Sequence, residues 1–205
     1  MNCTPEELRH IFESYRSVLL TAHVSPDGDA LGSLAAMAAW LKGRGKDVLV
    51  VIDDTIDDTF HRFEGCKDIV RPEDVQADPE RLSVVLDATD PGRTGKVAAL
   101  MTGKVVNIDH HVSNTHFADW EYIRTDCAAT GEILTELFTE WGAEITPSMA
   151  DALYMAIATD CGFFKFGNTT GHTLRMAALL VETGAAPNRV SERLEETTLV
   201  KINAL

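Results

Sequence analysis

The stretch Lys104-Val-Val-Asn-Ile108 runs directly into Asp109-His110-His111. Its first part is mainly apolar, as expected of a strand that is buried on both faces of a sheet. An acid and two imidazoles at the end of such a strand contribute little to packing. They are suited to binding a metal ion or a phosphate. The stretch therefore indicates a sheet with its chemistry gathered where the strands end.

Two other apolar runs end in the same way. Residues 17–22 lead into His23, with Asp27 and Asp29 shortly after, and residues 83–86 lead into Asp87. In open parallel sheets, ligands bind beyond the carboxyl ends of the strands. If these three strands are neighbours, their acids and imidazoles converge in one crevice.

The chain as a whole predicts strands that alternate with helices. Strands are expected at residues 17–22, 47–52, 83–87, 104–108 and 120–124. Helices are expected at residues 5–15, 30–42, 94–101, 128–141, 147–160, 170–183 and 187–196. Residues 60–80 show no clear pattern and are expected to be irregular, with short helical pieces at most. This order predicts an α/β fold with a doubly wound, mainly parallel five-stranded sheet flanked by helices.

Composition excludes some classes of protein. The formal charge is −14, from 18 basic and 32 acidic residues, so a plain basic surface for nucleic acid is absent. No apolar run reaches the roughly 18 residues that span a membrane, and the N-terminus lacks the features of a signal peptide. The four cysteines show no CxxC spacing. We therefore expect reduced thiols, a cytoplasmic location and no membrane partner.

The acids expected in the crevice would repel one another and favour protonation unless cations lie between them. Oxygen donors mixed with imidazole suit Mn²⁺, Mg²⁺ or Fe²⁺, and the lack of paired thiols argues against a structural zinc site. With this many donors, two ions are expected rather than one. Two ions about 3.5–4 Å apart suit the hydrolysis of phosphoesters.

Four stretches together resemble, in order and spacing, the motifs of the DHH phosphoesterases. They are His23-Val-Ser-Pro-Asp27-Gly-Asp29-Ala30, Leu86-Asp87, Asp109-His110-His111 and Ala158-Thr-Asp160-Cys-Gly-Phe. The resemblance covers nearly the whole chain. It is greatest to the nanoRNase and pAp-phosphatase branch, whereas RecJ-like exonucleases and family II pyrophosphatases are more distant.

The resemblance implies two divalent ions, most often Mn²⁺, with Mg²⁺, Fe²⁺ or Co²⁺ as alternatives. His23 and Asp27 would hold one ion. Asp29, His110 and Asp160 would hold the other.

The resemblance also implies the catalytic roles. Asp87 would bridge both ions, and His111 would face the phosphate. Asp109 would orient the site from behind, as carboxylates near ligating imidazoles commonly do. The attacking group would be a metal-bound hydroxide, so no protein nucleophile is required.

One departure from the family concerns the C-terminus. Its members usually carry a second domain, called DHHA1, with a glycine-rich stretch and basic residues for the substrate. No such stretch occurs before Leu205. We therefore expect a DHH domain at residues 1–196, and residues 197–205 as the start of a linker to a domain absent from this chain.

Weaker candidates for substrate contacts lie near these motifs. Arg93 follows the third strand, and a phosphate contact and a surface salt bridge are both open to it. Asn114 and His116 follow the double histidine, and Thr130 opens a helix whose free amides could receive an anion. Three other histidines, His10, His61 and His172, have no evident partner and are expected at the surface.

These features lead to one main hypothesis and two alternatives. The main one is a metal-dependent phosphoesterase that hydrolyses short oligonucleotides to nucleoside monophosphates, or removes the 3′-phosphate of 3′-phosphoadenosine 5′-phosphate (pAp). A cyclic-dinucleotide phosphodiesterase or an inorganic pyrophosphatase on the same site is the alternative within enzymes. A non-catalytic binding module is the alternative of another class, and it conflicts with the complete set of metal ligands. A homodimer is a further expectation.

Overall fold

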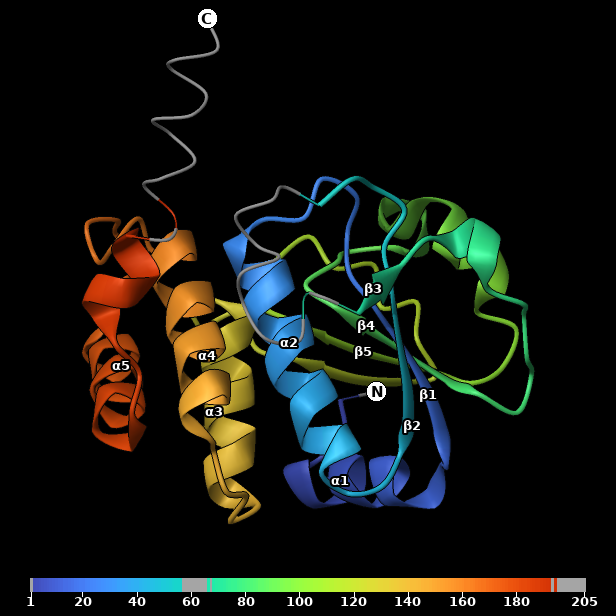
Figure 1. The fold of residues 1–205 in the computed structure, drawn as a ribbon, viewed down its shortest axis with the longest axis horizontal. Helices are drawn as coiled ribbons and strands as arrows, with labels where there is room; N and C mark the ends of the chain where they lie inside the picture. Colours follow the sequence, from blue (N-terminus) through green and yellow to red (C-terminus); the bar gives the residue numbers. More distant parts are fainter. Residues whose placement is uncertain (1, 57–65, 67, 193, 195–205) are drawn as a thin grey trace, which may run out of the picture.

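The computed structural model describes residues 2–56, 66, 68–192 and 194 (Figure 1). Its centre is a six-stranded sheet in the order β3-β2-β1-β4-β5-β6, in which every neighbouring pair is parallel. The strands are β1 (Ser17–Thr21), β2 (Asp47–Val51), β3 (Ile69–Val70), β4 (Leu82–Leu86), β5 (Val105–Asp109) and β6 (Trp120–Ile123). The predicted α/β fold with a parallel sheet is thus confirmed.

The strand count differs from the prediction by one. The additional strand, β3, has only two residues and lies within the stretch expected to be irregular. A strand of this length is too short to show the alternation of apolar and polar residues that marks a strand in a sequence. It pairs with the end of β2 and forms one edge of the sheet.

The α-helices whose bounds the structure describes in full are α1 (Pro5–Ser14), α2 (Gly28–Lys42), α3 (Thr130–Glu140), α4 (Pro147–Asp160) and α5 (Gly171–Thr183). The helix predicted at residues 94–101 is instead part of a 3₁₀ segment, η3 (Pro91–Leu100), which is kinked at Gly95. Residues 187–192 are helical, as predicted for the start of the last helix. The predicted linker, residues 197–205, lies outside the described residues.

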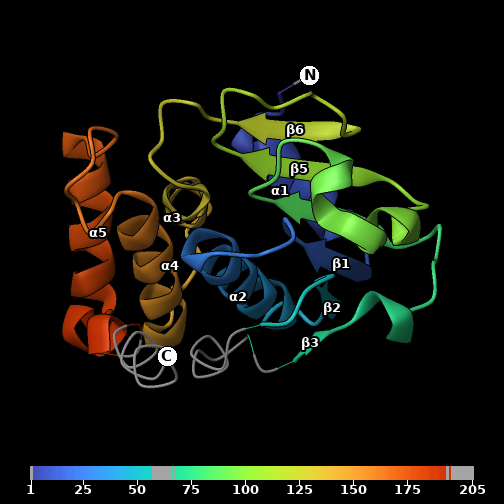
Figure 2. The same ribbon diagram turned by 90° about the horizontal axis from the view of Figure 1, so that it is seen from above.

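The two faces of the sheet are covered unequally. Val18 and Leu20 of β1 point into the main core, which they share with α1, α2, α3 and α4. Leu19 points to the other face, where it packs with Val51 and with Val97 of η3. Figure 2 shows α2, α3, α4 and α5 arranged outward from one face, with α5 farthest from the sheet.

Helices α2 and α4 pack closely along their length. A Cβ atom on Gly32 of α2 would lie 2.3 Å from the carbonyl oxygen of Ala152, and one on Gly28 would lie 2.4 Å from the hydroxyl of Thr159. The order of these contacts shows that the helices run antiparallel. The start of α2 therefore lies beside the end of α4, which brings Asp29 towards Asp160.

All four cysteines are described and none forms a disulfide. Within the described residues, no helix is both long and apolar enough to cross a membrane.

Candidate metal centre

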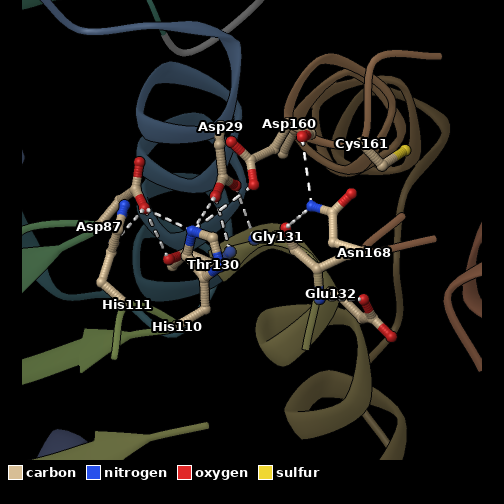
Figure 3. A network of polar contacts seen from close by, with 12 residues as sticks. Asp29, Asp87, His110, His111, Thr130, Gly131, Glu132, Asp160, Cys161 and Asn168 are labelled. Carbon is tan, nitrogen blue, oxygen red and sulfur yellow. Dashed lines mark hydrogen bonds and ion pairs between the residues drawn. The ribbon is translucent and has the colours of Figure 1, made fainter. Parts of the chain in front are cut away.

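The carboxyl ends of three neighbouring strands meet beside α2, α3 and α4 (Figure 3). β4 pairs with β1 on one side and with β5 on the other, as the sequence pattern required. Six donors predicted from the sequence lie together here, and we call them the inner cluster: His23, Asp27, Asp29, Asp87, His110 and Asp160. Strand ends supply His23, Asp87 and His110, and helix ends supply the other three.

One half of the inner cluster is built around His23. Its Nε2 lies 3.9 Å from Asp27 Oδ1 and 3.6 Å from Asp87 Oδ2. Its Nδ1 lies 2.7 Å from the carbonyl oxygen of Val24, to which it donates, so Nε2 is the atom turned to the acids. The carboxylates of Asp27 and Asp87 raise the pKa of His23 to about 10.

The other half is built around His110. Its Nε2 lies 3.8 Å from Asp29 Oδ2, 3.5 Å from Asp87 Oδ1 and 3.6 Å from Asp160 Oδ2. This nitrogen is buried and has no hydrogen-bond partner. Two donors that each lie about 2.0–2.2 Å from one ion are separated by roughly 3–3.6 Å. The spacing therefore resembles the edges of a coordination sphere more than a set of hydrogen bonds.

Asp87 belongs to both halves. Its Oδ2 faces His23 and its Oδ1 faces His110, so each oxygen serves a different set of donors. The residue follows β4 with φ 56°, in the left-handed region that non-glycine residues rarely occupy. Such a conformation costs on the order of 1–2 kcal/mol and is common at functional sites. The Thr130 hydroxyl donates to Asp87 Oδ1 at 3.1 Å and holds the carboxylate in place.

Asp29 is fully buried at the start of α2. The first amides of α3 hold it, because Thr130 N donates to Oδ2 at 2.7 Å and Gly131 N donates to Oδ1 at 2.8 Å. The Ser33 hydroxyl donates to Oδ1 at 3.2 Å. A Cβ on Gly131 would lie 2.4 Å from the Ala156 side chain, so only glycine allows α3 to approach this closely.

The acids of the inner cluster repel one another. Burial raises the pKa of Asp29 well above its ordinary value, and the charges of Asp87 and Asp160 raise it further. Burial likewise raises the pKa of Asp160. Burial would also raise the pKa of Asp87, but the imidazoles of His110 and His23 hold it well below its ordinary value. Divalent cations would remove this conflict, and the orphaned His110 Nε2 is directed at the same space. The residues present therefore fit two such ions.

Asp109 and His111 lie beside the inner cluster. Asp109 is fully buried, and its Oδ1 accepts from the His110 amide at 2.9 Å and lies 2.7 Å from His111 Nδ1. His111 is 42% exposed. Asp109 raises the pKa of His111. Asp109 thus contacts both His110 and His111, and its predicted orienting role stays a prediction.

The four weaker candidates for substrate contacts lie in different places. Arg93 is exposed, makes no ion pair within the described part of the chain, and its carbonyl accepts from the Val24 amide at 2.7 Å. It therefore stands beside the loop that follows β1. Thr130 is fully buried, with its amide on Asp29 and its hydroxyl on Asp87. Its contacts therefore hold two acids of the inner cluster in place.

The other two candidates, Asn114 and His116, make contacts with side chains of the protein. Asn114 donates to Asp109 Oδ2 at 2.7 Å. His116 Nδ1 lies 3.0 Å from Glu121 Oε2, and its side chain is otherwise largely exposed. Of the four candidates, Arg93 is the one whose charged group is free to meet a substrate.

A second set of donors lies on the other side of the start of α3, and we call it the outer cluster: Cys127, Glu132, Glu136 and His172. In Figure 3, Glu132 points away from Asp29. Glu132 accepts from the Ala128 amide at 2.8 Å and from the Thr173 hydroxyl at 3.1 Å. Arg124 donates to Glu136 at 3.0 Å. The outer cluster thus links α5 to α3 through completed contacts.

This arrangement corrects the expectation for His172, which was expected at the surface without a partner. Its Nε2 forms a close ion pair with Glu136 and lies 3.9 Å from Glu132 Oε1. His10 is exposed, as expected, although Glu6 and Glu13 lie within 4 Å of it. His61 lies outside the described residues.

Sequence reasoning missed Asn107 and Ser33. Asn107 is a fully buried amide in the middle of β5. A polar residue within an apolar run was a visible signal for it, since a buried amide needs partners. Ser33 follows Asp29 by four residues on the same helix, which places the two side chains together.

Comparison with known proteins agrees with this geometry. A family model described as "DHH family, N-terminal domain" matches residues 17–157. The bifunctional oligoribonuclease and PAP phosphatase NrnA of Thermus thermophilus is 32% identical over 194 residues, which cover 93% of this chain and 58% of the relative. The chain therefore spans less than two thirds of the length of this curated relative.

Solved structures share the fold. An exopolyphosphatase-related protein from Bacteroides fragilis superposes with a TM-score of 0.85 at 21% identity, over 92% of this chain and 59% of the other. A structure of the exonuclease RecJ bound to manganese superposes with a TM-score of 0.51 at 14% identity, over 90% of this chain and 48% of the other.

Proposed function

The chain belongs to the DHH family, and on this premise we propose that it carries the metal centre of a phosphoesterase. The substrates would be short oligonucleotides, cleaved to nucleoside monophosphates, or pAp, which would lose its 3′-phosphate. The relative from Thermus thermophilus is named for both activities. Because the chain matches just over half of that relative, activity and substrates are proposals for this protein.

The observation that supports the proposal best is that the two carboxylate oxygens of Asp87 face different sets of donors. One oxygen faces His23 and the other faces His110, at 3.6 Å and 3.5 Å. A carboxylate that only capped a strand would have no reason to lie between two imidazoles on a strained backbone. Two donor sets that share one acid are the arrangement expected for a pair of ions.

The inner cluster divides into two sets of ligands. His23, Asp27 and Asp87 would hold one ion, and Asp29, His110, Asp160 and Asp87 would hold the other. When bound, a pair of divalent ions activates water and neutralises charge on the phosphoryl oxygens. Oxygen and imidazole donors suit Mn²⁺, and RecJ binds manganese on a related fold.

The remaining residues would act on the substrate and on the ligands. His111 is open to the crevice beside Asp87 and would contact the phosphate. Arg93 is exposed beside the loop after β1 and would contact a further phosphate. The amides of α3 keep Asp29 from turning away, so the ligands are held before any ion arrives.

The test is hydrolysis of bis-p-nitrophenyl phosphate with Mn²⁺ and with EDTA. We expect Mn²⁺-dependent turnover that EDTA abolishes and that Asp87→Ala removes with little loss of fold, measured by circular dichroism. Glu136→Gln is the matched control, because it alters an acid of the outer cluster. Protein that binds Mn²⁺ yet shows no turnover would support a non-catalytic binding module instead.

The substrate is tested by comparing turnover on pAp, a dinucleotide, a cyclic dinucleotide and pyrophosphate. We expect the dinucleotide or pAp to have the highest kcat/KM. Higher kcat/KM on a cyclic dinucleotide or on pyrophosphate would favour one of those alternatives on the same metal centre.

A further inference from the structure

Four side chains form a continuous line of hydrogen bonds behind the inner cluster. The line runs from Asn107 through Asn114 and Asp109 to His111, with heavy-atom distances of 2.7 Å at each of its three links. All four residues belong to β5 or to the loop that follows it. None of the roles assigned above accounts for Asn107.

The orientation of the Asn107 amide is fixed by its surroundings. Its Nδ2 donates to the carbonyl oxygens of Val85 and Ala88, at 3.1 Å and 3.2 Å. Both of its hydrogens are therefore used on β4 and on the residue after Asp87. Its Oδ1 must then face Asn114, and it can only accept a hydrogen bond there.

Asn114 is consequently fixed as well. Its Nδ2 donates one hydrogen to Asn107 Oδ1 and the other to Asp109 Oδ2, both at 2.7 Å. Its Oδ1 accepts from the His116 amide at 2.8 Å. Every polar group of the side chain is thus taken up by protein, and none is left for a substrate.

Asp109 in turn fixes the orientation of the His111 ring. With Oδ2 held by Asn114, the carboxylate turns Oδ1 to His111 Nδ1, at 2.7 Å. A carboxylate only accepts, so Nδ1 carries the hydrogen. The second ring nitrogen, Nε2, is then the one that His111 offers to the crevice. This also argues against His111 as a metal ligand through Nδ1, although that atom lies 3.7 Å from Asp87.

We propose that Asn114, locked by Asn107, is a positioning residue that makes Asp109 hold His111 in the tautomer with Nδ1 protonated and Nε2 directed at the phosphoester. This role adds to the proposed function, and its effect on catalysis rests on that function. It replaces the expected substrate contact of Asn114. The hydrogen-bonded line is made by protein groups alone, so it can be tested without substrate.

The first experiment reads the tautomer of His111 by ¹⁵N nuclear magnetic resonance of histidine-labelled protein. The His111 signals are identified by their absence in His111→Gln. In the parent protein we expect the Nδ1 signal of His111 to be that of a protonated nitrogen that donates a hydrogen bond to Asp109. In Asn114→Ala the two nitrogens should move towards averaged values, because Asp109 loses the hydrogen bond that fixes Oδ2 and keeps only the His110 amide as a second partner.

The second experiment measures kcat, KM and Mn²⁺ affinity. Asn114→Ala should lower kcat about 10–100-fold, as for other residues that orient a ligand from behind. KM and the Mn²⁺ dissociation constant should stay within about threefold, since Asn114 touches neither substrate nor ion. Asn114→Asp should lower kcat further, because it donates to neither neighbour and sets a second carboxylate against Asp109.

Asn2→Ala is the matched control. The Asn2 amide also makes two hydrogen bonds, both to the Ile123 backbone, but it lies at the far edge of β6. The Asn2→Ala substitution should leave the His111 signals and kcat unchanged. Asn114→Ala with an unchanged tautomer would overturn the proposal, and so would a changed tautomer with unchanged kcat.

Two other outcomes would also overturn the proposal. A rise in KM at constant kcat would return Asn114 to substrate binding, and a loss of Mn²⁺ affinity would place its effect on His110. If the parent protein hydrolyses no phosphoester, the proposed function fails, and the resonance experiment alone still decides whether Asn114 sets the tautomer.

Discussion

The inner and outer clusters offer similar donors on opposite sides of the start of α3, yet their contacts differ. In the outer cluster, Arg124 and His172 pair with Glu136, and Thr173 donates to Glu132. In the inner cluster, no lysine or arginine among the described residues contacts an acid, and His110 Nε2 has no hydrogen-bond partner. A count of possible ligands does not separate the two clusters. Acids paired with cations are expected of a structural link, whereas an unpartnered imidazole among unneutralised acids is expected of a binding site.

The largest effect that this comparison predicts is on turnover. Asp87→Asn keeps an acceptor for the Thr130 hydroxyl but removes the shared charge, so kcat should fall by at least about 100-fold, beyond the usual loss for supporting partners. The variant should stay folded, although it loses the favourable pairing of the Asp87 carboxylate with the imidazoles of His110 and His23. Activity assays and thermal melts measure both. A large loss of stability with intact kcat would show Asp87 to be structural.

The next effect concerns stabilisation by the ion. At a Mn²⁺ concentration of 100 times its dissociation constant, the folded state should gain about 2.7 kcal/mol for each ion that it binds. For a chain of this length that is roughly 5–10 °C in Tm. Differential scanning calorimetry should show the shift in the parent protein and in Glu136→Gln, but not in Asp87→Asn. If the Mn²⁺-induced shift in Tm were absent in Glu136→Gln, the ion would be assigned to the outer cluster.

A change in the free energy of unfolding of similar size is expected when the buried side of the outer cluster is altered. Glu132→Ala leaves the Ala128 amide and the Thr173 hydroxyl without their acceptor, and each unmet group costs about 1–3 kcal/mol. Chemical denaturation should show a loss of about 2–3 kcal/mol. Mn²⁺ affinity, measured by calorimetry, should stay within about threefold, and a larger change would join the two clusters into one functional unit.

The smallest effect is expected at the exposed side of the outer cluster. His172 is 39% exposed, and ion pairs of this exposure contribute about 0–1 kcal/mol. His172→Ala should therefore change the free energy of unfolding by less than about 1 kcal/mol, with kcat unchanged. A loss of several kcal/mol would mean that the pair with Glu136 fixes α5 to α3 far more strongly than its exposure suggests.

The sequence predicted the parallel sheet and the donors of the inner cluster because both follow local patterns. Apolar runs mark the strands, and acids or imidazoles at their ends must meet when those strands are neighbours. Glu132 and Glu136 likewise share a helix face by their spacing. That His172 would meet them depends on how α5 packs against α3, which no local pattern contains.

Contacts made by backbone groups could not be predicted from the sequence either. Asp29 is held by amides of Thr130 and Gly131 that are 101 and 102 residues away. Every residue except proline has such an amide, so the sequence carries no mark of its use. The two-residue strand β3 is missed for a related reason, because its pairing depends on β2 and leaves no pattern of its own.

The close packing of α2 against α4 has a consequence for ion size. Asp29 stands at the start of one helix and Asp160 at the end of the other, so the distance between their carboxylates depends on the close contacts of Gly28 with the Thr159 side chain and of Gly32 with the Ala152 carbonyl oxygen. A methyl group at position 32 would separate the helices and widen that gap. Mg²⁺ needs ligands at about 2.0–2.1 Å, whereas Ca²⁺ accepts about 2.3–2.6 Å. Gly32 offers no ligand atom of its own, yet it would limit the size of the ions that the inner cluster accepts.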